Sequence, residues 1–163
     1  MLLKVPSNGT VITKAKDSVL VAKNKVNLLA TVDKSKQRNM VLLLPFNINK
    51  IETDSVKTKT EQLKTNKFLN LTLDFYAGAL MAIDSAKVLG LPVNVKVYDV
   101  ESTKYSSNVA SIISKNDFEN VDAVVGPFQN SVVETTAQLL TKYNTPVISP
   151  LSKERGLPLS NLY

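Results

Sequence analysis

Polar residues gather between an apolar run and an amphipathic run in the stretch DAVVGPFQNS, residues 122–131. Ala123–Val125 has the composition of a buried strand, and a Gly-Pro pair ends it. Gln129, Asn130 and Ser131 follow at once. Two interpretations are open for these three side chains: they form a turn and a helix cap, or they contact a ligand.

Ser131 is the residue for which both interpretations make a specific prediction. The sequence Ser131-Val-Val-Glu134 fits a reciprocal capping box, with the serine as N-cap and the glutamate at the third helical position. The start of a helix also offers free N–H donors and the positive end of its dipole, which suit a carboxylate. A capping role does not exclude contact with a ligand carboxylate, so both predictions stand for Ser131.

Two further serines flank Pro150 and Leu151 at the end of the apolar stretch PVIS. Serine and proline are frequent in turns, so a turn after a strand is one interpretation of Ser149–Ser152. In the other, Ser152 and the nearby backbone N–H groups hold a small polar ligand.

Asp99 and Glu101 form a carboxylate pair whose spacing invites a catalytic interpretation. If strand periodicity continues through them, both side chains point to the same face. Acid–base catalysis also needs a suitable partner, and the sequence contains no His and no Cys. We therefore interpret the pair as a solvated strand end and predict that the protein is not an enzyme.

Composition narrows the chemistry further. Without Cys or His, thiol catalysis and thiolate or imidazole metal sites are excluded. The sequence holds neither a G-x-G-x-x-G nor a G-x-x-x-x-G-K-[ST] motif, so no nucleotide site is expected, and we predict no cofactor and no metal. No apolar run reaches the roughly 18 residues of a membrane span, and Met1–Pro6 is too short for a signal peptide, which would lie upstream.

The net charge of +6 is unevenly spread along the chain. Residues 1–67 hold 13 of the 20 basic residues but only 5 of the 14 acidic ones. A solvated lysine-rich segment is the simpler interpretation of this excess, and binding to an anionic polymer is the alternative. Nucleic acid is not expected as a partner, because the basic residues are not interleaved with aromatic ones.

Apolar and amphipathic segments alternate from residue 40 onward. Residues 1–39 are predicted to be a linker, and the Lys- and Thr-rich residues 48–67 an exposed insertion, partly helical or disordered. Strands are predicted at 40–46, 93–100, 121–125 and 146–150, and helices at 68–89, from Ser107 and at 131–143. The apolar stripe of the first helix is predicted from spacings of three and four: Leu71, Phe75, Ala79, Ala82, Ala86 and Leu89.

Alternation of this kind predicts an α/β fold, a three-layer open parallel sheet with helices on both faces. In a parallel sheet the carboxyl ends of all strands share one edge, where ligands of open α/β folds bind. Polar residues follow each predicted strand, so the sequence predicts a ligand site at that edge.

Four segments carry a resemblance to a known family: VLLLPFN, FYAGALMAIDSAKVLGLPVNVKVYDVEST, VDAVVGPFQNS and TPVISPLS. Residues 40–163 resemble the N-terminal lobe of type I periplasmic binding proteins, the leucine and branched-chain amino acid receptors and their relatives. The resemblance implies that two lobes clamp a small ligand, often an amino acid. The matching ligand-binding positions in this sequence are Gln129, Asn130, Ser131, Pro150, Leu151 and Ser152.

This sequence departs from that family in two ways. The insertion at 48–67 stands where ligand-gripping residues often follow the first strand, and the chain stops at Tyr163, before the lobe is finished. An incomplete sheet would leave an unpaired edge, so we expect the chain to self-associate.

A second, shorter resemblance lies at the start, where Leu2–Pro6 is similar to the closing strand of a LysM repeat, a module that grips peptidoglycan. Together the two resemblances imply a periplasmic or cell-envelope protein. The expected function is non-enzymatic recognition of a small amino-acid-like solute. The alternative is a protein-interaction or regulatory module in peptidoglycan synthesis, with cell-wall proteins or peptidoglycan as its partners.

Overall fold

The computed structural model of the chain describes residues 28–103, 106–151 and 156–163. The chain divides into two compact units, Met1–Asp33 and Lys34–Tyr163. Of the first unit only residues 28–33 are described, and they contain the short helix α2 (Leu28–Thr31). The possible LysM segment at 1–6 and most of the predicted linker lie outside the described residues.

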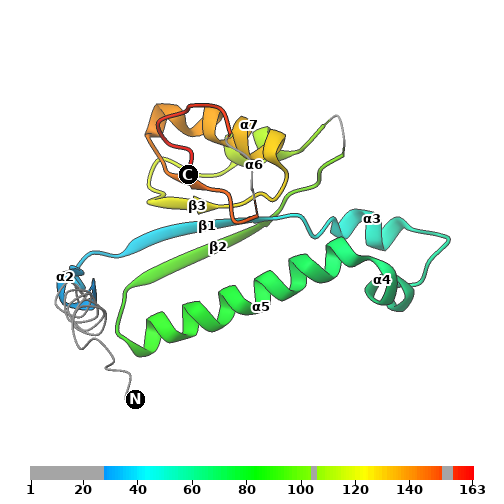
Figure 1. Cartoon of the computed structure of the whole chain (residues 1–163), viewed down its shortest axis with the longest axis horizontal. Coiled ribbons are helices and arrows are strands. Elements are labelled where there is room, and N and C mark those ends of the chain that lie inside the picture. The colour runs from blue at the N-terminus through cyan, green and yellow to red at the C-terminus, as the bar shows by residue number, and fades with distance from the viewer. Residues whose placement is uncertain (1–27, 104–105, 152–155) are drawn as a thin grey trace, which may run out of the picture. The chain divides into compact units, whose positions relative to one another are not determined.

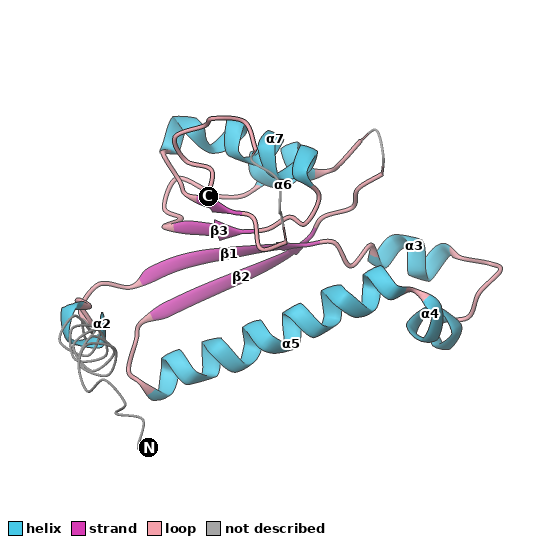
Figure 2. Ribbon diagram, in the orientation of Figure 1, coloured by secondary structure: helices cyan, strands magenta, loops and turns pink. Residues whose placement is uncertain are grey.

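The second unit is built on a four-stranded sheet with the order β2-β1-β3-β4. The strands are β1 (Arg38–Leu44), β2 (Val93–Asp99), β3 (Ala123–Val125) and β4 (Val147–Ile148). All three pairings are parallel, with Leu42 of β1 opposite both Val97 and Val125 (Figure 2). The predicted fold class, an open parallel sheet within an α/β fold, is confirmed.

Strand β1 is buried on both faces, as its continuous apolar sequence predicts. Val41 and Leu43 belong to the larger core cluster, which packs under α6 (Val109–Lys115) and α7 (Asn130–Leu140). Leu42 and Leu44 belong to a smaller cluster on the other face, where Phe75 of α5 (Lys67–Val88) packs. Figure 1 shows α6 and α7 on one face of the sheet and α5 on the other, which completes the three predicted layers.

The long helix α5 lies within one residue of its predicted bounds, but its buried side is rotated from the predicted stripe. Phe75 and Ala79 pack on the core, whereas Leu71 is 43% exposed and Leu89 45% exposed. Thr72 is fully buried instead, because its hydroxyl donates a hydrogen bond to the Phe68 carbonyl oxygen and so needs no water. A stripe drawn through apolar residues alone missed this threonine.

The Lys- and Thr-rich insertion forms two short helices, α3 (Ile48–Thr53) and α4 (Lys59–Thr65). Helix α4 begins with a complete capping box: Thr58 accepts from the Glu61 backbone N–H, and Glu61 accepts from that of Thr58. The predicted capping box at Ser131 is wrong. Helix α7 begins one residue earlier, Gln129 is its N-cap without a side-chain bond, and Glu134 accepts from the Leu157 N–H instead.

Two other local predictions also need correction. The cap of α6 is Asn108, not Ser107. The outer edge of β4, expected to be unpaired, carries the last residues of the chain: Ser149 N–H donates to the Tyr163 carbonyl and Tyr163 N–H to that of Val147. The edge on which we based self-association is therefore covered in the structure. The 3-10 helix η1 (Thr141–Tyr143) follows α7 on the way to β4.

Candidate functional site

The loops after β1 and β2 are tied together at the carboxyl edge of the sheet. The two carboxylate oxygens of Asp99 accept from the backbone N–H groups of Asn47 and Ile48, each at 2.8 Å. Glu101 accepts from the Asn49 side chain. Asp99 and Glu101 are therefore not the solvated strand end that the sequence predicted, because both anchor the start of the α3 helix.

The turn after β3 is closely packed. Gly126 has φ +91° and its N–H donates to the Ile148 carbonyl at 2.9 Å, and the peptide bond to Pro127 is cis. A Cβ at Gly126 would collide with the Leu43 carbonyl, so only glycine fits between β3 and β1 here. Phe128 then turns inward onto Phe75 of α5, with ring centroids 5.2 Å apart.

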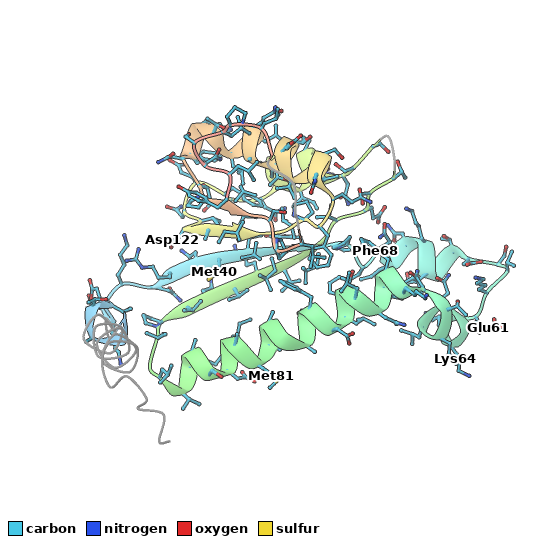
Figure 3. The ribbon with its side chains drawn as sticks, in the orientation of Figure 1. Met40, Glu61, Lys64, Phe68, Met81 and Asp122 are labelled. Atoms are coloured by element: carbon cyan, nitrogen blue, oxygen red, sulfur yellow. The ribbon has the colours of Figure 1, made fainter. Side chains whose placement is uncertain are left out.

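A hollow of about 490 Å³ opens at this edge, and we call it the edge hollow. The insertion, the start of α5 and the turns after β1, β2 and β3 all contribute to it. Figure 3 shows Phe68 at the start of α5, next to the insertion helices α3 and α4. Apolar residues form part of the wall: Pro45, Phe46, Ile51, Phe68 and Leu69. The remaining lining residues are polar: Asn47, Lys50, Thr53, Asp54, Gln62, Asn66, Ser102 and Gln129.

The two charged side chains that line the edge hollow, Lys50 and Asp54, each form hydrogen bonds to neighbouring residues. Lys50 Nζ donates to the Ser102 carbonyl oxygen at 3.0 Å. Asp54 accepts from the Val56 and Lys57 backbone N–H groups and, at 2.7 Å, from the Gln62 side chain. The Val56 N–H is the main cause that lowers the pKa of Asp54, so this carboxylate stays ionised at neutral pH.

The sequence-predicted site residues do not share one hollow. Gln129 lines the edge hollow, whereas Asn130 lines a hollow of about 410 Å³ beside the C-terminal segment. Ser131 is exposed and lines a third, of about 340 Å³, with Ser106 and Ser107.

The second predicted ligand segment is only partly described. Pro150 is half-buried and Leu151 is 39% exposed, and Ser152 lies outside the described residues. The strands that carry the two segments, β3 and β4, are parallel neighbours.

The polar residues that the insertion and its neighbours bring to the edge hollow were not predicted from the sequence. Gln62 and Asn66 lie in or just after α4, and Ser102 follows β2. The capping box Thr58-Lys-Thr-Glu61 was an available signal for α4. Among the described residues, no group of His, Cys, Asp and Glu could hold a metal ion. In the same residues, no helix is long and apolar enough to cross a membrane.

No family model and no curated protein matches the sequence. Solved structures match its fold: a branched-chain amino acid transporter substrate-binding protein, LivJ, from Streptococcus pneumoniae, in complex with isoleucine, is 21% identical with a TM-score of 0.55. Two ABC transporter substrate-binding proteins from Desulfitobacterium hafniense, one in complex with leucine, are 14% and 13% identical, both with TM-scores of 0.53.

Each of these alignments covers 78% of this chain and 33% of the matched chain. The chain therefore spans about a third of the length of these proteins. At this level of identity the likeness establishes the fold alone, an open parallel α/β sheet that matches part of these proteins. The LysM resemblance has no support from these comparisons.

Proposed function

We propose that the chain is part of a non-enzymatic binding protein of the periplasm or cell envelope that recognises a small amino-acid-like solute. The solute binds at the carboxyl edge of the sheet. The segments that contact it are residues 129–131 at the start of α7 and residues 150–152 after β4. In this proposal the α7 N–H groups and the Ser131 hydroxyl face the solute carboxylate.

One observation carries this proposal: four parallel strands deliver four polar segments to a single edge, where the edge hollow opens. Ligands of open α/β sheets bind at that edge, because loops and helix N-termini meet there. The matched solved structures are substrate-binding proteins, two of them with isoleucine or leucine bound, which supports an amino-acid-like solute. The peptidoglycan-assembly alternative drew in part on residues 1–6, which lie outside the described residues, and no contact among the described residues favours it.

Backbone amide shifts measured by NMR during amino-acid titrations test the proposal, because they detect binding even at a Kd of about 1 mM. We expect the amides of residues 129–131 to shift with at least one amino acid. Ser131→Ala should weaken that binding about three- to tenfold, the effect of one lost hydrogen bond. If none of the common amino acids shifts any amide at the carboxyl edge, the proposed function is wrong.

A further inference from the structure

The edge hollow contains two neutral polar side chains that are almost fully buried. Gln62 is 9% exposed and Ser102 is 8% exposed. Gln62 Nε2 donates to Asp54, but its Oε1 and the Ser102 Oγ have no hydrogen-bond partner among the described residues. Solvent in the hollow reaches both atoms, since neither is one of the fully buried side-chain atoms that lack a partner, and both are therefore available to a ligand there.

Two further amide side chains at the hollow are also available. Asn66 uses its Oδ1 to cap α5, accepting from the Leu69 N–H at 3.0 Å, and its Nδ2 has no partner among the described residues. Gln129 makes no side-chain cap bond to α7. The free groups therefore include both donors and acceptors, and none of these four side chains is charged.

The charged residues of the hollow do not change this balance. Lys50 and Asp54 carry opposite charges, and each is already hydrogen-bonded within the wall. Because the two charges are opposite and no other charged side chain lines the hollow, the lining has no net charge that would favour a charged ligand group over a neutral one. A neutral hydrogen-bonding group can use the four free side chains without disturbing the bonds of Lys50 and Asp54.

We propose that the edge hollow selects an amino acid whose side chain carries a carboxamide or a hydroxyl, in preference to a branched aliphatic one. This inference rests on the proposed function and names the solute class of that site. Gln129 lines the hollow and precedes Asn130 and Ser131. The proposal places the solute carboxylate at the start of α7 and its side chain in the edge hollow, which Gln129 borders.

The selectivity follows from the cost of an unsatisfied buried group. An aliphatic side chain in the hollow would displace water from Gln62 Oε1 and Ser102 Oγ and offer them nothing in return. A site that hydrogen-bonds its ligand discriminates strongly against ligands that lack the matching polar group. An apolar pocket discriminates less strongly against ligands that carry an extra polar group.

The test is an amide-shift titration of the 163-residue chain with L-asparagine, L-glutamine and L-serine against L-leucine and L-isoleucine. We expect at least one of the polar amino acids to bind at least tenfold more tightly than either aliphatic one, and the amides of Asn66 and Ser102 to shift. Ser102→Ala should weaken binding about three- to tenfold, since one hydrogen bond is lost. Ser111→Ala, at an exposed position of α6, is the matched control and should leave it unchanged.

Asn66→Asp is the second variant, because aspartate caps a helix as well as asparagine does and so preserves the start of α5. It removes the Nδ2 donor, and we expect binding of the polar solute to weaken although the melting temperature is kept. This inference would be overturned if leucine or isoleucine binds more tightly than the polar amino acids, or if neither substitution changes the affinity for the polar amino acid. The proposed function would stand in both cases. No binding by any of the five would overturn this inference, and the proposed function would fall as well only if the other common amino acids also shift no amide at the carboxyl edge.

Discussion

Asp99 holds the insertion to the sheet, so its replacement by asparagine should release α3. In Asp99→Asn one oxygen can still accept an N–H, but the NH₂ group faces the N–H that the second oxygen now binds at 2.8 Å. Losing a charge-assisted bond and leaving that N–H unpaired should destabilise the attachment by about 2–3 kcal/mol. Local opening at Asn47 and Ile48 should then become about 30- to 150-fold more frequent.

Hydrogen exchange of individual amides measures this opening directly. We expect the Asn47 and Ile48 amides to exchange faster in Asp99→Asn, whereas the amides of β3 keep their protection because that strand does not depend on the contact. Asp74→Asn is the matched control, since Asp74 is exposed on α5 and makes no hydrogen bond or ion pair among the described residues. Unchanged exchange at Asn47 and Ile48, or a uniform rise across the sheet, would refute the proposed local anchoring.

Two other predictions concern stability. Gly126→Ala should cost about 2–5 kcal/mol, measured as a lower denaturation midpoint, because φ is +91° and the new Cβ meets the Leu43 carbonyl; Gly78→Ala, where a Cβ has open space, should not lower the midpoint. The Asn39 N–H and Arg38 lower the pKa of Asp122 below 3.8. The contribution of Asp122 to the stability of the fold should therefore be complete above pH 3.8 and be lost as the pH falls below it. In Asp122→Asn the denaturation midpoint should fall less steeply as the pH drops below about 4. An unchanged fall would show that Asp122 does not cause it.

The sheet could be predicted because its signals are local and redundant. The unbroken apolar run at residues 40–44 favours burial on both faces, which a central strand of a parallel sheet provides, and residues 41–44 are indeed buried. The alternation with helices then leaves few ways to order the strands. Strand β3, by contrast, is only three residues long, and its neighbours rather than its own length place it between β1 and β4.

Cap positions and helix faces were harder to predict, because several local solutions have the same sequence signature. Ser131 and Glu134 have the spacing of a capping box, as Thr58 and Glu61 do, yet only the second pair forms one. Glu134 instead accepts from the N–H of Leu157, 23 residues later, a contact that no local pattern contains. The buried side of α5 was misplaced for a similar reason, since Thr72 satisfies its hydroxyl within the helix.

The edge hollow opens at the sheet edge that the sequence indicated, but most of its lining comes from residues that were not selected from the sequence. Topology alone brings the turns after the strands to one edge, so the segment 129–131 could be placed there in advance. The wall of the edge hollow depends on the tertiary contacts that fold residues 48–66 over that edge, above all those of Asp99 and Lys50. The Lys- and Thr-rich composition of the insertion gives no indication of these contacts.

Different residues form the core of the sheet and line the edge hollow. The residues that close the sheet core, such as Leu43 and Val124, do not line the edge hollow. Gln62 and Asn66, which do line it, contribute nothing to the strand pairings. Under the proposed function, substitutions in the insertion would change the solute without changing the fold, as is usual for loops on a rigid scaffold. A shared fold with isoleucine- and leucine-bound proteins is thus compatible with a preference for a polar solute.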